Sequence, residues 1–162
     1  MSLRDTILET VEAEKATYEQ IALDIHAHPE VSNYEFFACK RLSDQLAAEG
    51  FAIQVDVAGH RTGFTASYKA QKPGPVLVFL AEYDALAGYG PENKDPGHAC
   101  GHNWIAATTA GAAVTLARYC AVEGLEAQIL LVGSPAEETF SSKALLANAG
   151  VFNGVDCAMQ AH

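Results

Sequence analysis

Hydrophobic and polar residues follow two different periods along the chain, and these divide it into helices and strands. Apolar residues from Ile7 to Ile25 recur at helical spacing, which predicts a first helix that ends before Pro29. Residues 32–35 (Ser-Asn-Tyr-Glu) have the form of a capping box that begins a second helix, and Gly50 would end it.

The period then changes to two, which indicates strands. Alternating residues from Phe51 to Val57 and from Phe64 to Tyr68 predict an antiparallel pair joined by a glycine-containing loop. Residues 72–75 (Lys-Pro-Gly-Pro) predict a turn. The unbroken apolar run from Val76 to Ala81 is typical of a strand that is covered on both faces.

The rest of the chain alternates helices with strands. After a loop, the pattern predicts a helix over about Asn103–Cys120, a strand at Gln128–Val132, a helix from Pro135 to about Ala149 and a last strand at Val155–Met159. This order predicts an α/β fold, a three-layer αβα sandwich around a mixed, mostly parallel sheet. In such sheets, ligands bind outside the carboxyl ends of the strands.

Composition and charge narrow the function. The 162 residues are 49% hydrophobic and 19% charged, which fits one globular domain. A net charge of −10 argues against a nucleic-acid partner, and no apolar run approaches the roughly 20 residues of a membrane span. Four widely spaced cysteines and the lack of an apolar leader indicate a reducing, cytoplasmic compartment.

Side chains that bind metals or transfer protons follow the predicted strand ends. The segments are residues 82–84 (Glu-Tyr-Asp), residues 97–102 (Gly-His-Ala-Cys-Gly-His) and residues 135–138 (Pro-Ala-Glu-Glu), and His162 follows the last strand. Because the sheet topology would gather these segments at one edge, we expect a functional site there.

Cys100 and His102 are two residues apart, so both can face one ion, and Gly101 relieves the bend between them. Thiolate and imidazole are good zinc ligands, and the N-terminus of the next helix would help to keep the thiol deprotonated. A buried cysteine beside an ordinary loop histidine is the alternative. His60, in the loop of the hairpin, is expected to be solvated.

Glu137 and Glu138 are adjacent at a strand-to-helix junction, where their side chains point in different directions. One can bind a metal while the other moves a proton in metal-assisted hydrolysis. Alternatively, the two acids only favour a helix N-terminus. Asp84 could cap a turn or orient a ligand histidine.

These motifs resemble the N-terminal part of the metal-dependent amidohydrolases of the aminoacylase and carboxypeptidase superfamily. The matching stretches are residues 24–30 (Asp-Ile-His-Ala-His-Pro-Glu), 62–63 (Thr-Gly), 81–86 (Ala-Glu-Tyr-Asp-Ala-Leu), 97–103 (Gly-His-Ala-Cys-Gly-His-Asn) and 135–138. Within these stretches, residues 82–86 (Glu-Tyr-Asp-Ala-Leu) and 100–103 (Cys-Gly-His-Asn) are most similar to the p-aminobenzoyl-glutamate hydrolase branch.

The resemblance implies hydrolysis of the amide bond in an N-acyl or N-aroyl amino acid or a dipeptide-like substrate at a site with two divalent ions, zinc or manganese. It implies Cys100 as the bridging ligand, His102, Glu138 and His162 as further ligands, Glu137 as general base and Asp84 as a supporting carboxylate. Glu82, where many relatives have aspartate, and Ser141-Ser142 depart from the family pattern, and neither is expected to touch a ligand.

The resemblance also implies that relatives continue beyond residue 162 with a lid domain, which contributes to homodimers, and a further part of the catalytic domain with one more histidine ligand. Residues 1–162 are therefore expected to be the N-terminal portion of a truncated catalytic domain, with an incomplete metal site and little activity alone. Two other hypotheses stay open: a metal-binding or interaction module without catalysis, and a thiol hydrolase with Cys100 as nucleophile and His102 as base.

Overall fold

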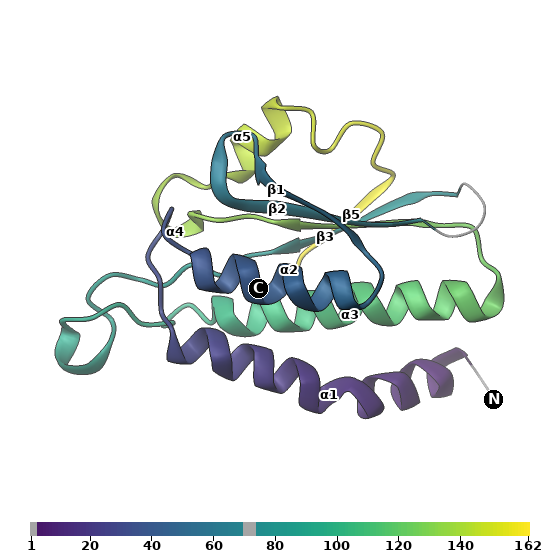
Figure 1. The fold of residues 1–162 in the computed structure, drawn as a ribbon, viewed down its shortest axis with the longest axis horizontal. Helices are drawn as coiled ribbons and strands as arrows, with labels where there is room; N and C mark the ends of the chain where they lie inside the picture. Colours follow the sequence, from purple (N-terminus) through teal and green to yellow (C-terminus); the bar gives the residue numbers. More distant parts are fainter. Residues whose placement is uncertain (1–2, 70–73) are drawn as a thin grey trace.

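The computed structural model describes residues 3–69 and 74–162, which fold around one five-stranded sheet (Figure 1). The turn predicted at residues 72–75 includes Lys72 and Pro73, which lie outside the described residues. In chain order the elements are α1 (Leu3–Ala27), α2 (Phe36–Ala48), β1 (Ala52–Val57), β2 (His60–Lys69), β3 (Val76–Ala81), the 3-10 helix η1 (Pro91–Asn93), α3 (His102–Glu123), β4 (Gln128–Gly133), α4 (Glu137–Phe140), α5 (Lys143–Asn148) and β5 (Cys157–Met159).

The sheet is mixed, as predicted, with the strand order β1-β2-β4-β3-β5. β2 is antiparallel to both β1 and β4, whereas β3 is parallel to β4 and to β5. The last residues of β3 and β4, Ala81 and Gly133, are paired in register. The segments that follow these two strands therefore leave the sheet side by side, at the edge where ligands bind in such folds.

Helices cover both faces of the sheet, which gives the predicted αβα sandwich (Figure 1). On one face α2 packs on β1 and β2, α3 packs on β3 and β4, and α1 lies outside them against α3. The main core on this face contains Ile21, Leu42 and Leu131. On the other face, Leu146 of α5 covers Val78 and Val132 in a second apolar cluster.

The helix α3 is built from small residues, and this lets its neighbours approach closely. A Cβ at Gly111 would lie 3.1 Å from the ring of Tyr18 on α1, so the glycine allows the two helices to touch. Among the described residues, α3 is the one helix long and apolar enough to cross a membrane by length and composition. More than half of its most apolar stretch is buried inside the protein, as in many core helices.

The predicted capping box is wrong. The helix α2 begins at Phe36, and the carboxylate of Glu30 accepts hydrogen bonds from the main-chain N–H groups of Phe37 and Ala38. Because Glu30 satisfies these free donors of the first turn, the predicted box residues are released for other contacts. Ser32 donates to Asp84, and Glu35 points into the interior.

Two further expectations need correction. The single helix predicted after Pro135 is two short helices, α4 and α5, because Ser141 adopts a positive φ of 49° that breaks the helix. His60 is the first residue of β2 and not a solvated loop residue. Its ring is buried and stacks on Phe140, with the ring centroids 5.7 Å apart.

Candidate metal centre

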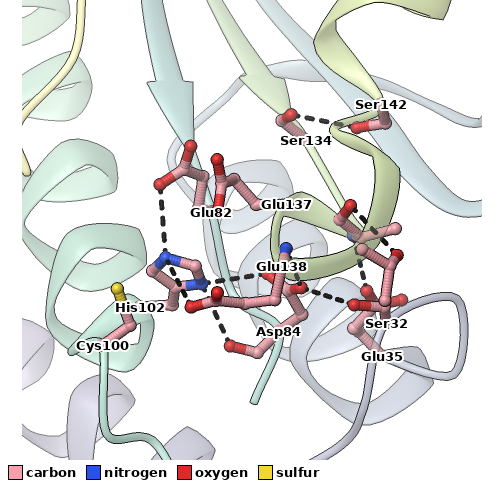
Figure 2. A network of polar contacts seen from close by, with 12 residues as sticks. Ser32, Glu35, Glu82, Asp84, Cys100, His102, Ser134, Glu137, Glu138 and Ser142 are labelled. Carbon is pink, nitrogen blue, oxygen red and sulfur yellow. Dashed lines mark hydrogen bonds and ion pairs between the residues drawn. The ribbon is translucent and has the colours of Figure 1, made fainter. Parts of the chain in front are cut away.

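The segments predicted to carry metal-binding or proton-transferring side chains meet at the carboxyl edge of β3 and β4. The segment after β3 carries Glu82 and Asp84, and the segment after β4 carries Glu137 and Glu138 (Figure 2). A main-chain hydrogen bond of 2.8 Å from Ser134 N to Ala81 O holds the two segments together where they leave the sheet. His102, the first residue of α3, and Cys100, in the turn just before that helix, come to the same place, as Figure 2 shows.

His102 lies at the centre of this cluster and is fully buried. Its Nδ1 lies 2.9 Å from Oδ1 of Asp84 and 3.1 Å from the main-chain oxygen of Asp84. Since both neighbours are acceptors, Nδ1 carries the proton and donates it. The other ring nitrogen, Nε2, faces Oε2 of Glu82 at 3.5 Å and Oε1 of Glu138 at 3.7 Å.

Three buried polar atoms face one another here without a hydrogen-bond partner among the described residues. They are Nε2 of His102, Oε2 of Glu82 and Oε1 of Glu138. Buried polar atoms are nearly always paired, and distances of this length are too long for ordinary hydrogen bonds. A divalent cation between a neutral imidazole nitrogen and two carboxylate oxygens would satisfy all three, so the residues present fit a metal ion.

Cys100 and His162 extend the cluster on its other side. Sγ of Cys100 lies 3.7 Å from Nε2 of His162, and ligand atoms of Cys100, His102 and His162 all lie within 4.8 Å of one another. A second group within the same limit contains His102, Glu137 and Glu138. The structure therefore brings the four predicted ligands together around His102, and their role as ligands stays a prediction.

The buried carboxylate of Asp84 accepts three hydrogen bonds. Besides Nδ1 of His102, it accepts hydrogen bonds from Oγ of Ser32 at 2.8 Å and from the main-chain N–H of Glu138 at 3.0 Å. Burial by itself would raise its pKa, but these hydrogen bonds outweigh burial and hold the pKa of Asp84 below its usual value. For His102, burial lowers the pKa, and the bond to Asp84 and the nearby carboxylates raise it further than burial lowers it.

Glu82 and Lys143 add contacts that the sequence did not predict. Glu82 is fully buried beside His102, so the expectation that this position touches no proposed ligand is wrong. Its other oxygen pairs with Nζ of Lys143 and accepts a hydrogen bond of 2.7 Å from Gln160. Nζ of Lys143 also lies 3.5 Å from Oε1 of Glu137. Lys143 thus balances part of the negative charge at this edge.

The thiol of Cys100 is not deprotonated by the helix that follows it. Burial, a hydrogen bond to Glu138 and the charges of the neighbouring glutamates raise the pKa of Cys100 to about 11. Burial and the neighbouring carboxylates therefore favour the neutral thiol, contrary to the expectation that the helix N-terminus keeps it deprotonated. A neutral thiol is a weak nucleophile, which argues against the thiol hydrolase, whereas a metal ion can displace the proton of a coordinating thiol.

Sequence reasoning also missed Glu35. Its carboxylate is fully buried and accepts hydrogen bonds from Thr62 Oγ1 at 2.7 Å and from Ala136 N at 2.8 Å. Burial raises the pKa of Glu35, against the effect of these hydrogen bonds. An acidic residue just before a helix looks like a capping residue, and that likeness hid the contact with a segment 101 residues away.

No family model matches the chain. Among proteins of known sequence, one of the subunits of the p-aminobenzoyl-glutamate hydrolase of Escherichia coli (strain K12) is 33% identical over 164 residues, which cover 95% of this chain and 34% of that protein. N-acetylcysteine deacetylase of Bacillus subtilis (strain 168) is 34% identical over 146 residues, covering 86% of this chain and 38% of the relative. The chain thus spans little more than a third of the length of the curated relatives it matches.

A solved structure supports the same relationship. A dinuclear metal binding peptidase from the M20 family, from Bacillus subtilis, superposes with a TM-score of 0.78 at 28% sequence identity. The match covers 93% of this chain and 44% of that peptidase. The chain agrees in sequence with a p-aminobenzoyl-glutamate hydrolase subunit and a deacetylase, and in fold with an M20 peptidase. The chain belongs to the M20 family of amidohydrolases and peptidases.

Proposed function

We propose that the chain carries the metal-binding half of an active site that hydrolyses the amide bond of N-acyl or N-aroyl amino acids, or of dipeptide-like substrates. The observation that carries the proposal is the convergence of three unpaired buried atoms, from Glu82, His102 and Glu138, beside the thiol of Cys100. The names of the relatives, a hydrolase of p-aminobenzoyl-glutamate, a deacetylase and a peptidase, support the substrate class.

In this proposal Cys100, His102, Glu138 and His162 would hold two divalent ions, zinc or manganese, and Oε2 of Glu82 would face the ion that His102 and Glu138 hold. Sulfur, nitrogen and carboxylate oxygen donors together suit zinc, and imidazole and carboxylate also suit manganese. The name of the dinuclear peptidase supports the number of ions. Bound divalent ions would lower the pKa of a water molecule and polarise the amide carbonyl.

The protein's own groups would then move the protons. Glu137 accepts a proton from the attacking water at a carboxylate oxygen, the water oxygen bonds to the carbonyl carbon, and the C–N bond breaks as Glu137 passes the proton to the leaving nitrogen. Asp84 contributes by holding the ring of His102 with Nδ1 as the donor. Lys143, 3.5 Å from Glu137, keeps the carboxylate near the site.

We further propose that residues 1–162 are the N-terminal portion of the catalytic domain and that the complete protein adds a lid and dimerisation domain. The partial coverage of the relatives supports this extent. Under this proposal the 162-residue chain binds metal but turns over substrate slowly alone, and the complete protein acts in a reducing compartment, as a homodimer.

The test combines metal counting with turnover. The chain is stripped with a chelator and reloaded with Zn²⁺ or Mn²⁺, bound metal is counted by mass spectrometry, and hydrolysis of p-aminobenzoyl-glutamate and N-acetyl amino acids is measured by chromatography. The same assay is applied to the longest polypeptide that the gene encodes. Glu137→Gln should retain the metal and lose about 100-fold or more in kcat, as expected for a general base.

The outcomes separate the candidate functions. Two ions per chain with turnover in the longer polypeptide support the proposal. Stoichiometric metal without turnover in either polypeptide favours a metal-binding module, for which the partial match to the relatives is the supporting observation. Fast alkylation of Cys100 that zinc does not slow, with activity that survives chelation, would favour the thiol hydrolase and contradict the proposal.

A further inference from the structure

The glutamate pair is placed by a main-chain turn that an ordinary residue adopts only under constraint. Ala136, directly before Glu137, has φ 57° and ψ 38°, in the left-handed region, and is fully buried. The helix that follows is only four residues long, and no side chain of its own caps it. A left-handed alanine persists only where its surroundings fix it, so the contacts of Ala136 decide where the two carboxylates point.

The contact that fixes this turn comes from a distant part of the chain. Oε1 of Glu35, at the start of α2, accepts the main-chain N–H of Ala136 at 2.8 Å. Oε2 of Glu35 accepts the hydroxyl of Thr62, on β2, at 2.7 Å. The main-chain oxygen of Thr62 in turn accepts the hydroxyl of the buried Tyr83 at 2.6 Å. Glu35 is therefore held on one side by the sheet and holds Ala136 on the other.

A second carboxylate fixes the far side of the glutamate pair. Asp84 accepts the main-chain N–H of Glu138 at 3.0 Å (Figure 2). Because Glu35 accepts that of residue 136, each of these two N–H groups is bound by a buried acid. Asp84 already has a role in orienting His102, whereas Glu35 touches none of the proposed ligands and no step of the proposed hydrolysis uses it. A buried acid with both oxygens committed in this way requires a reason.

We propose that Glu35 is a positioning residue of the metal site. It fixes the left-handed turn at Ala136, and through that turn it presents the carboxylates of Glu137 and Glu138 to His102 and Cys100. The inference rests on the proposed function, because it assigns Glu35 a role in that same site. Glutamine can make the same contact, since its amide oxygen accepts the Ala136 N–H and its amide nitrogen donates to the Thr62 hydroxyl.

The test uses Glu35→Ala, Glu35→Gln and a matched control, Glu30→Ala. Glu30 is an acid of the same loop whose carboxylate also accepts two hydrogen bonds, but from the N-terminus of α2 and not from the glutamate segment. Two quantities are measured on the 162-residue chain: the affinity for Zn²⁺ by competition with a chromogenic chelator, and hydrogen exchange at the amides of residues 136 and 138 by NMR.

We expect Glu35→Ala to weaken Zn²⁺ binding by about 10- to 100-fold, the effect typical of losing a group that orients a ligand. In this variant, exchange at the amides of residues 136 and 138 should speed up relative to the parent chain, by at least about tenfold more than exchange at the other core amides does. Glu35→Gln should restore both quantities to within about threefold, and Glu30→Ala should lower the unfolding midpoint while leaving Zn²⁺ affinity within about threefold.

Unchanged Zn²⁺ affinity and unchanged amide exchange in Glu35→Ala would overturn the inference, and so would an equal loss of affinity in Glu30→Ala. If Glu35→Ala does not fold, Glu35→Asp replaces it, because one methylene less prevents the carboxylate from reaching both partners. If the parent chain binds no Zn²⁺, the proposed function fails, and exchange at residues 136 and 138 alone decides whether Glu35 fixes the turn.

Discussion

At the scale of single residues, Asp84 connects the parts of the site. Its carboxylate contacts a side chain before α2, the imidazole at the start of α3 and the main chain of α4. These three donors come from segments far apart in the sequence, and a single buried acceptor aligns them. Both the orientation of His102 and the position of Glu138 therefore depend on the acceptor atoms of this one side chain.

Asp84→Asn tests this dependence. The new amide nitrogen would face donors where an acceptor oxygen now lies, so His102 loses its orienting bond or Glu138 its main-chain contact. We expect Zn²⁺ affinity to fall by about 10- to 100-fold, measured by chelator competition. Ser32→Ala, which removes only one of the three donors, should cost less affinity than Asp84→Asn. Equal affinities in the parent chain and Asp84→Asn would contradict this role.

Glu35 gives a prediction about pH. Because burial raises its pKa above the usual value near 4.5, the folded chain holds a proton on Glu35 at pH values where the unfolded chain has released it. The free energy of unfolding therefore falls as the pH rises from the usual value through the raised one. Glu35→Gln lacks this effect, so its stability relative to the parent should increase over that interval and then level off. Urea unfolding between pH 4 and 8 measures the difference, and a difference that shrinks with rising pH is the contrary result.

The sequence alone could identify the donor atoms of the site but not the contacts between them. Cys100, His102, Glu137 and Glu138 are recognisable from residue type and spacing. The pairing of Glu35 with Ala136 and of Glu82 with His102 and Lys143 depends on which segments the fold brings together. A local pattern therefore suggested a capping box where the protein uses a long-range anchor.

At the scale of elements, the turn that leads into α3 combines two proposed ligands with one glycine. Gly101 precedes the helix with φ 79°, which only glycine adopts without strain, and it lies between Cys100 and His102. The glycine was predictable from the sequence, because a bend between two candidate ligands favours this residue. The break between α4 and α5 was not predictable, since Ser141 carries no local signal for its positive φ.

Gly101→Ala measures what this turn contributes. A Cβ at residue 101 would meet no atom within 4 Å, so the cost is backbone strain, about 1–2 kcal/mol. Gly124→Ala is the matched control, because Gly124 ends the same helix with φ 64° and equally open space. We expect similar losses in the free energy of unfolding from both variants but weaker Zn²⁺ binding only from Gly101→Ala. Equal affinities in the two variants would contradict the role of the turn.

At the scale of the whole molecule, the sheet topology decides where the chemistry lies. The alternation of strands and helices predicted a mixed sheet with helices on both faces, and the parallel pairing of β3 with β4 brings the two acidic segments to one edge. Periodicity could predict this because it reflects the burial of whole faces. It could not predict that α1 would lie on α3 and not on the sheet, since both positions bury one apolar face.

Metal binding should stabilise the entire fold, because the proposed ligands come from separate elements. At a free Zn²⁺ concentration of 100 times Kd, linkage gives about 2.7 kcal/mol, or roughly 5–10 °C in Tm for a chain of this size. Cys100→Ser should reduce this shift, whereas Cys157→Ser should not, because Cys157 is exposed at the opposite end of the sheet. Calorimetric scans measure the shift, and the same shift in both variants would indicate binding elsewhere.

The wide spacing of the cluster also has a consequence for how the protein is made. Glu82 and His162 are separated by about half of the polypeptide, and the anchor from Glu35 to Ala136 spans 101 residues. A nascent chain on the ribosome would therefore bind the proposed ion only after nearly all of this region has emerged and packed. In a zinc finger the ligands lie close together in the sequence and the ion drives folding. Here the ion would instead bind to a fold that has already formed, and stabilise it.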